Sequence, residues 1–335
     1  MKKISLLLTL IAVIVFSACA QTSKSVHLKT VFHIKSASWW DYLEIGPIND
    51  RLYVSHGNQV NILNKISGDS IGIIENTKGV HGIAFDIANN EGFTSNGALN
   101  NVTVFNIISN KIITQIPTGQ NPDAIFYEPF SKKIITCNGR SKSLSIIDAA
   151  QNKVVDSVYI GGKPETAVSD GKGKIFVNVE DKNEIVQIDA KTFKVLNHWS
   201  IKPGQNPTGL AIDTKTNRLF AGCEKLLLVI DAGNGKVIDK IIIGDGCDGV
   251  AFDEITKNIY TSNGEGTLSV IHEENANKYV FVTNVVTKKS ARTLILDKKS
   301  HLIYLPAAEF DTSLKDSRGR ALIKPGSFQI LVFGK

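Results

Sequence analysis

The feature of this chain that most constrains its fold is an internal repeat with a period of about 42 residues. A phrase that combines small, apolar and acidic residues recurs seven times, in steps of 40, 42, 42, 43, 40 and 44 residues. The aligned positions are Tyr42, Gly82, Ala124, Thr166, Gly209, Gly249 and Thr293. Seven copies at this period are typical of a β-propeller in which each copy forms one blade.

Each copy contains four segments that are typical of short β-strands. A second strand begins about eleven residues after the aligned position, as in "RLYVSHG", "EGFTSNG" and "NIYTSNG". Third strands such as "LSIID" lead through turns rich in Gly, Asn and Asp, which tolerate positive φ, into fourth strands such as "KVIDKI". Beyond the N-terminal segment no long stretch shows helical periodicity. The sequence therefore predicts an all-β, seven-bladed β-propeller with four antiparallel strands per blade.

The two ends of the repeat region predict how the propeller closes. The last copy supplies only three strands after Thr293, ending in 327–333, whereas the first copy is preceded by an orphan strand at 27–35. We expect the orphan to complete the last blade, because closure removes open sheet edges. The predicted propeller spans residues 27–335, with a long insertion at 306–326 in its last blade.

Residues 1–18 have the pattern of a secretory signal peptide, in which a basic start precedes an apolar run from Leu6 to Phe16. This run is shorter than the roughly 20 residues that a membrane-spanning helix needs. We therefore expect export to the cell envelope.

The residues around the predicted cleavage point allow two interpretations. "FSAC", at 16–19, resembles a lipobox, which would make Cys19 the acylated first residue of a lipoprotein, with residues 19–26 as its linker. Ala18-Cys19-Ala20 is alternatively an A-x-A cleavage site of a plainly secreted protein. We favour the lipoprotein, facing the periplasm or the cell surface.

The second-strand phrases "YVSHG", "FTSNG" and "YTSNG" resemble those of the YVTN-repeat propellers, the YncE-like family of exported bacterial proteins. The resemblance covers most of the chain after the signal, and the last-blade insertion is similar to a proline-rich loop of some members. It implies the fold and export, and it brings no catalytic residues.

Charge and short motifs exclude several kinds of partner. Without the signal the chain has 36 basic and 32 acidic residues, a net charge of +4 with scattered lysines, so nucleic acid is not an expected partner. "GDGCDG", at 244–249, fits a dinucleotide fingerprint but precedes strands instead of a helix. "GDSIG", at 68–72, fits a nucleophile elbow but lies in a turn between strands. We expect a monomer that binds a small ligand or a protein.

Three cysteines remain after Cys19. Cys137 is expected to be a small buried residue. Cys223 and Cys247 are expected at the same end of the disc, where they form either a disulfide or two free thiols. No C-x-x-C or His-rich spacing suggests a structural zinc site.

The candidate binding residues lie where inner strands begin. "GQNP" occurs at 119–122 and again at 204–207, and the residue that follows it opens an inner strand at the mouth of the central channel. That slot, called here the mouth ring, holds Asp41, His81, Asp123, Glu165, Thr208, Asp248 and Arg292. A second tier is expected at the ends of the second strands, at His56, Asn96, Asn138, Cys223 and Asn263.

Two interpretations of these residues stay open. Polar side chains at strand starts can simply face water, and Asn at the second tier can be a turn former. Carboxylates on separate rigid strands can instead bind a ligand or a divalent cation, the one cofactor that the pattern suggests.

The favoured function is a non-catalytic binding or interaction module acting through the channel mouth. The alternative is a metal-dependent propeller lactonase or hydrolase, for which Glu165, Asn138 and Asp123 offer suitable residue types. We assign no catalytic residues.

Overall fold

The computed structural model describes residues 25–35, 38–316 and 319–335 of the 335-residue chain. The predicted signal peptide, Cys19 and most of the linker at 19–26 lie outside these residues. Within them, no helix is long and apolar enough to cross a membrane.

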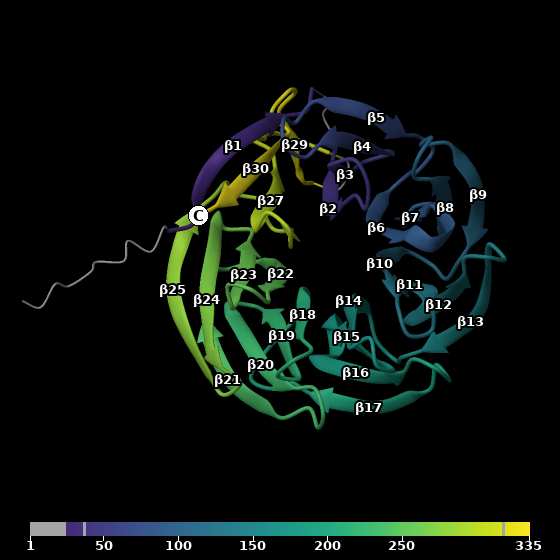
Figure 1. Ribbon diagram of the computed structural model, residues 1–335. Helices are drawn as coiled ribbons and strands as arrows, with labels where there is room; N and C mark the ends of the chain where they lie inside the picture. The colour runs from purple at the N-terminus through teal and green to yellow at the C-terminus, as the bar shows by residue number, and fades with distance from the viewer. Residues whose placement is uncertain (1–24, 36–37, 317–318) are drawn as a thin grey trace, which may run out of the picture.

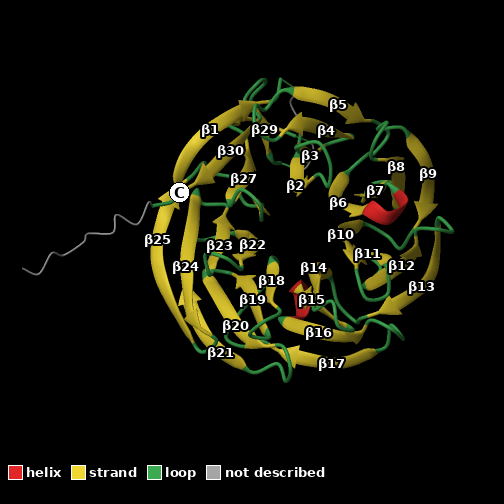
Figure 2. Cartoon of the chain, viewed as in Figure 1, coloured by secondary structure: helices red, strands yellow, loops and turns green. Residues whose placement is uncertain are grey.

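Seven four-stranded antiparallel sheets surround a central axis, as predicted (Figure 1). Blades one to three, written from the inner to the outer strand, are β2 (Trp40–Ile45), β3 (Arg51–His56), β4 (Gln59–Asn64), β5 (Ser70–Ile74); β6 (Val80–Asp86), β7 (Glu91–Asn96), β8 (Asn101–Asn106), β9 (Ile112–Pro117); and β10 (Pro122–Glu128), β11 (Lys133–Asn138), β12 (Ser143–Asp148), β13 (Lys153–Tyr159). Blades four to six are β14 (Pro164–Ser169), β15 (Lys174–Val179), β16 (Glu184–Asp189), β17 (Val195–Ser200); β18 (Leu210–Asp213), β19 (Arg218–Cys223), β20 (Leu226–Asp231), β21 (Val237–Ile242); and β22 (Cys247–Asp253), β23 (Asn258–Asn263), β24 (Thr267–Asn275), β25 (Lys278–Val286). Blade seven is β26 (Ile295–Asp297), β27 (Leu302–Ala307), β30 (Gln329–Gly334) and β1 (His27–His33). Two short 3₁₀ helices, η1 (Ile87–Asn89) and η2 (Glu180–Lys182), are the helical elements of the described chain (Figure 2).

The predicted closure of the ring is confirmed. β1 pairs antiparallel with β30, with His27 opposite Gly334 and His33 opposite Gln329. The strand ends two residues earlier than predicted, although the backbone N–H of Ile34 still donates to the carbonyl of Phe328 at 2.9 Å. Both ends of the described chain therefore belong to one blade.

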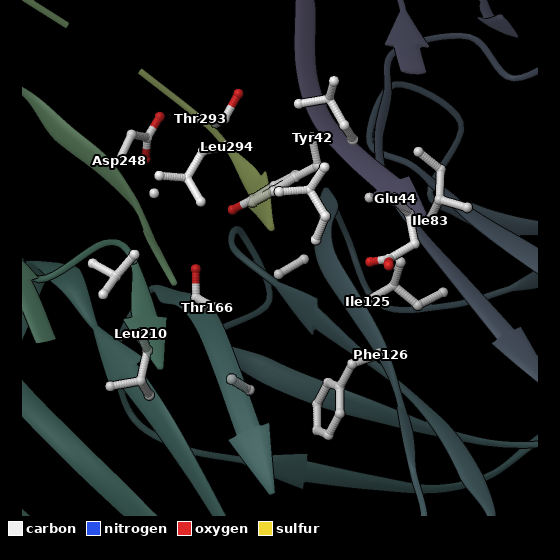
Figure 3. A pocket seen from close by; sticks show the side chains of 18 residues that line it. Tyr42, Glu44, Ile83, Ile125, Phe126, Thr166, Leu210, Asp248, Thr293 and Leu294 are labelled. Carbon is white, nitrogen blue, oxygen red and sulfur yellow. The ribbon is translucent and has the colours of Figure 1, made fainter. Parts of the chain in front are cut away.

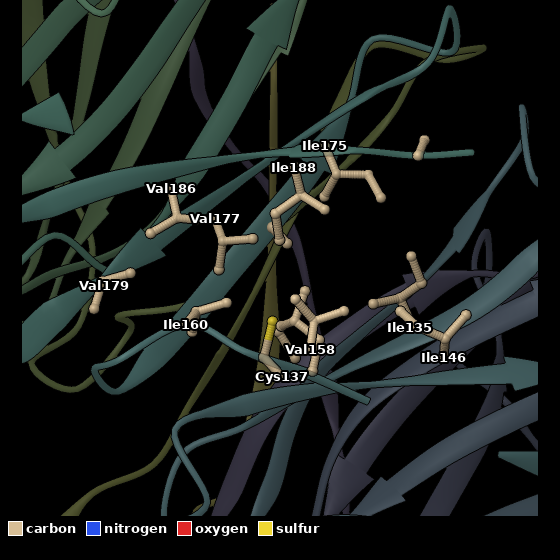
Figure 4. Close-up of a cluster of buried hydrophobic side chains, with 14 residues drawn as sticks. Ile135, Cys137, Ile146, Val158, Ile160, Ile175, Val177, Val179, Val186 and Ile188 are labelled. Atoms are coloured by element: carbon tan, nitrogen blue, oxygen red, sulfur yellow. The ribbon is translucent and has the colours of Figure 1, made fainter. Parts of the chain in front are cut away.

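The core lies between neighbouring blades. Middle strands are buried along most of their length, as in β11 and β12, whereas the outer strand β13 is mostly exposed. Figure 4 shows β-branched residues of blade three, such as Ile135 and Ile146, packed against Val177 and Ile188 of blade four. Cys137 is buried in this cluster, as expected. Such burial stabilises at about 25 cal/mol per Å² of apolar surface, so the blades hold one another.

The insertion in the last blade forms a hairpin of β28 (Phe310–Lys315) and β29 (Ala321–Ile323). Phe310 packs on Trp39 and Trp40, with ring centroids 5.6 and 6.1 Å apart. The guanidinium of Arg320 lies 4.0 Å from the ring centroid of Trp39. These contacts hold the hairpin against the segment that enters blade one.

Candidate functional site at the channel mouth

All seven residues of the mouth ring line one cavity of about 420 Å³. Five of them are the second residues of inner strands, namely Asp41, His81, Asp123, Glu165 and Asp248. The pairing register of each of these strands shifts at that point. A bulge of this kind changes the direction in which a side chain points. Here the bulges occur at the residues whose side chains face the cavity.

Side chains of second strands satisfy the backbone at these bulges. Ser55 Oγ accepts from the backbone N–H of Asp41 at 3.0 Å, and Ser95 Oγ accepts from that of Gly82 at 2.8 Å. Thr293 Oγ1 donates to the carbonyl of Asp41 at 2.6 Å. The backbone that carries the ring is therefore held in place on both sides.

Most carboxylates of the ring are held by cationic side chains. His81 Nδ1 lies 2.6 Å from Asp41 Oδ2, and Arg292 pairs with Asp248 and, at 3.4 Å, with Asp41 Oδ1. Lys163 Nζ lies 2.5 Å from Glu165 Oε1. The cavity thus contains a network of ion pairs.

Asp123 differs from the other ring acids. Its Oδ1 atom is buried and has no hydrogen-bond partner among the described residues. Its cationic neighbour is His81, whose Nδ1 lies 3.7 Å away, beyond hydrogen-bond distance. Asp123 is therefore a carboxylate with unused ligand capacity.

Burial and mutual repulsion shift the pKa values of these groups. Burial, reinforced by Asp41 and Asp248, raises the pKa of Asp123 to about 6 against the opposing effect of His81. Burial and the charge of Asp123 raise the pKa of Glu165 to about 8 despite Lys163. Burial lowers the pKa of His81, but Asp123 and Asp41 outweigh it and raise that pKa to about 9. All three groups therefore hold their protons more strongly than they would in water, which means that the site favours additional positive charge.

Three of the ring residues are placed to hold a metal ion. One ligand atom each from Asp41, His81 and Asp123 lies within 4.8 Å of the other two. These residues come from the adjacent inner strands β2, β6 and β10. Gly97 makes room for the imidazole, because a Cβ at that position would lie 2.7 Å from His81 Nε2.

The predicted second tier does not line this cavity. Asn96, Asn138 and Asn263 are fully buried, and their side chains bridge strands of their own blades. His56 is also buried and stacks on Phe328 at 4.2 Å. The donors and the acceptor of a buried amide need hydrogen-bond partners. The three Asn amides have such partners within their own blades.

Cys223 and Cys247 are free thiols in the structure, so the disulfide alternative is not formed. Both are buried, and Cys247 is the first residue of β22. Burial raises the pKa of Cys223 to about 12 and that of Cys247 well above its ordinary value. Neutral buried thiols of this kind are structural and poorly reactive.

Tyr42 lines both the mouth cavity and the adjoining part of the channel, which Figure 3 shows from close by. The seven aligned positions of the repeat all line a narrow waist of about 150 Å³. Six are small or medium-sized, because the inner strands approach closely there: a Cβ on Gly209 would lie 2.7 Å from the backbone nitrogen of Val250. Among the seven aligned positions Tyr42 is the one aromatic residue, and it lines both the mouth cavity and the waist.

Beyond the waist lies Glu44, which lines the channel and the cavity of about 520 Å³ at its opposite end. Burial raises the pKa of Glu44 to about 7. The two mouths thus differ in chemistry.

Sequence reasoning missed three residues that shape the site, namely Tyr42, Lys163 and Glu180. Lys163 lies two residues before Glu165 and also pairs with Glu180. A signal was available for Glu180, because blade four has Val179-Glu180 where blades two, three and six have Asn-Gly at the end of the second strand.

Comparison with known proteins supports the fold but assigns no family or function. No family model matches the chain, and no curated protein matches it. A solved structure of Kuenenia stuttgartiensis hydrazine synthase is similar, with a TM-score of 0.72 over 88% of this chain and 97% of that chain. The two are 14% identical, so this similarity concerns the propeller alone.

Proposed function

We propose that this protein is a non-catalytic binding module whose channel mouth takes a divalent cation through Asp41, His81 and Asp123. The observation that carries the proposal is the buried Oδ1 of Asp123, which has no hydrogen-bond partner in the described part of the chain and lies beside two further metal-ligating groups. A cation there would provide that partner and offset both the burial and the repulsion from Asp41 and Asp248 that raise the pKa of Asp123.

The donor set favours Zn²⁺ over Ca²⁺ and Mg²⁺. One imidazole nitrogen and two carboxylates suit Zn²⁺, whereas Ca²⁺ and Mg²⁺ prefer oxygen ligands. Zn²⁺ is therefore the first probe, with Ca²⁺ as a comparison.

The alternative, a metal-dependent hydrolase, would use the same cation, because three protein ligands leave a coordination position for water. We favour binding because the ring carboxylates that are not cation ligands are engaged: Glu165 pairs with Lys163, and Asp248 pairs with Arg292. Neither is free to act as a general base beside the cation.

Zn²⁺ binding at pH 7 is expected to release about one proton, because the metal must displace the proton of His81. The pKa of His81 is about 9, so the imidazole is protonated before binding, and the affinity should rise with pH up to that value. Titration calorimetry in two buffers of different ionisation enthalpy measures the released proton. Asp123→Asn should weaken binding more than about tenfold.

Two glycines provide a matched control for this titration. Gly97→Ala should weaken Zn²⁺ binding, because its methyl group would displace the His81 ring, whereas a Cβ on Gly139 meets no atom closer than 3.7 Å. Gly139→Ala should therefore bind like the wild type. Binding without proton release, or equal affinity in Asp123→Asn, would contradict the proposed site.

We also propose that the protein is an exported lipoprotein of the YVTN-repeat type, anchored through Cys19. Its support is the lipobox-like "FSAC" and the repeat phrases. Cys19→Ala is expected to move the protein from the membrane fraction to the soluble fraction, because the acyl chains provide the anchor. Cell fractionation and immunoblotting measure this change. A wild-type protein that is already soluble would support the A-x-A cleavage instead.

A further inference from the structure

A second cavity of about 540 Å³ adjoins the channel mouth on the side of the insertion hairpin. Its lining includes Trp39, Trp40 and Arg320, together with Arg140 from the loop between β11 and β12. It shares Asp41, His81 and Arg292 with the mouth ring. Its volume is within the range of small-molecule sites.

The charges around this cavity are mainly positive. Three guanidinium groups line it, those of Arg140, Arg292 and Arg320, against one carboxylate, that of Asp41. Arg292 is committed to Asp248 and Asp41, and Arg320 pairs with Asp316 at 2.8 Å. The exposed guanidinium of Arg140 makes no ion pair or side-chain hydrogen bond among the described residues. Arg140 is therefore available to a ligand.

Trp40 lines the same cavity and carries a buried donor without a partner in the described chain. Trp40 is 5% exposed, and its indole Nε1–H has no acceptor among the described residues. Buried indole N–H groups normally find a hydrogen-bond partner. This N–H is itself buried, so the group that the cavity offers to a ligand is the free guanidinium of Arg140.

We propose that this cavity binds a small organic anion whose carboxylate or phosphate oxygens are held by Arg140. Guanidinium groups bind such oxyanions through paired, charge-assisted hydrogen bonds. Arg320, held over Trp39, and Arg292 add positive charge around the same space. This anion site shares Asp41 and His81 with the proposed cation site, but it holds its ligand through Arg140 and does not require that the cation be bound.

The test uses the whole propeller in metal-free buffer at low ionic strength, with succinate and inorganic phosphate as probes. Titration calorimetry gives the affinity, and tryptophan fluorescence reports the location, because two of the three tryptophans line the cavity. Arg140→Gln is expected to weaken probe binding by about tenfold or more, the usual effect of losing a charge-assisted hydrogen bond.

Lys172→Gln is the matched control. It removes one exposed positive charge from the loop between β14 and β15, at the opposite end of the second strands from the loop of Arg140. It should change probe affinity by less than about twofold, since it alters only the long-range field.

The outcomes separate the two sources of the oxyanion. Binding of succinate alone supports a carboxylate ligand, binding of phosphate alone supports a phosphate ligand, and binding of both supports the shared chemistry. Equal loss of affinity in Arg140→Gln and Lys172→Gln would overturn the proposal, as would no binding of either probe at about 10 mM, where even weak specific sites fill.

Discussion

Phe32→Ala is expected to lower the free energy of unfolding by about 3 to 5 kcal/mol, the usual cost of removing a buried phenylalanine side chain. Phe32 is 5% exposed in β1 and packs against Tyr304, with ring centroids 6.5 Å apart. It also fills the space above Gly68 of blade one. The residue therefore connects blade seven to blade one at the point of closure.

Leu28→Ala provides a control on the same strand. Leu28 is 47% exposed, so its truncation should cost less than about 1 kcal/mol. Urea unfolding of the two variants measures the difference. Similar small effects would mean that the ring does not depend on β1, whereas deletion of residues 20–36 should destabilise the disc further by exposing the edge of β30.

Glu165→Gln is expected to stabilise the metal-free protein by about 1 to 3 kcal/mol at pH 7 to 8 and to have little effect near pH 4.5. The pKa of Glu165 is raised from 4.5 to about 8, so the folded state disfavours the charged carboxylate that the unfolded chain carries. Wild-type stability should therefore fall as pH rises from 4.5 to 8. Glutamine has no such charge, and Lys163 keeps Glu180 as its partner.

His81 acts in the same direction over a higher pH range. Its pKa is raised from 6.5 to about 9, so its stabilising charge is fully present below pH 6.5 and is lost as pH rises through 9. Asp297 acts in the opposite direction: burial opposes its ionisation, but hydrogen bonds from Lys65 and Ser300 lower its pKa. Asp297→Asn should therefore destabilise the protein at neutral pH.

Urea unfolding between pH 4.5 and 9 measures both variants. The expected signature is opposite signs for Glu165→Gln and Asp297→Asn at pH 8. A loss of stability in Glu165→Gln at pH 8 would show that the pair with Lys163 outweighs the cost of burying the carboxylate.

The convergence of the mouth ring could be predicted from the sequence because one slot per repeat must reach the channel once the period is known. The second tier could not be placed by the same counting. Asn96 lies two residues after Thr94 and hydrogen-bonds it at 3.0 Å, and Asn138 and Asn263 repeat this pattern with Thr136 and Thr261. Thr-x-Asn at the end of a strand was therefore a signal of internal bonding, not of ligand binding.

The choice of cation ligands shows the limit of sequence reasoning. Glu165, Asn138 and Asp123 have suitable residue types, but Asn138 is buried within blade three and Glu165 is held by Lys163. The structure instead groups Asp123 with Asp41 and His81. The seven slots are equivalent in the repeat, so the grouping depends on side-chain length and on which charges already have partners.

The closing blade also determines how the molecule would bear a mechanical load. The chain enters β1 at its His27 end, and that strand is the outermost of blade seven (Figure 1). A force applied through the preceding residues would therefore reach the disc through the hydrogen bonds between β1 and β30. A pull away from the rim would open them one after another from the His27–Gly334 pair, whereas a pull along the strand would load them together. The direction of pulling thus determines how much force is needed to separate β1 from β30 and open the ring.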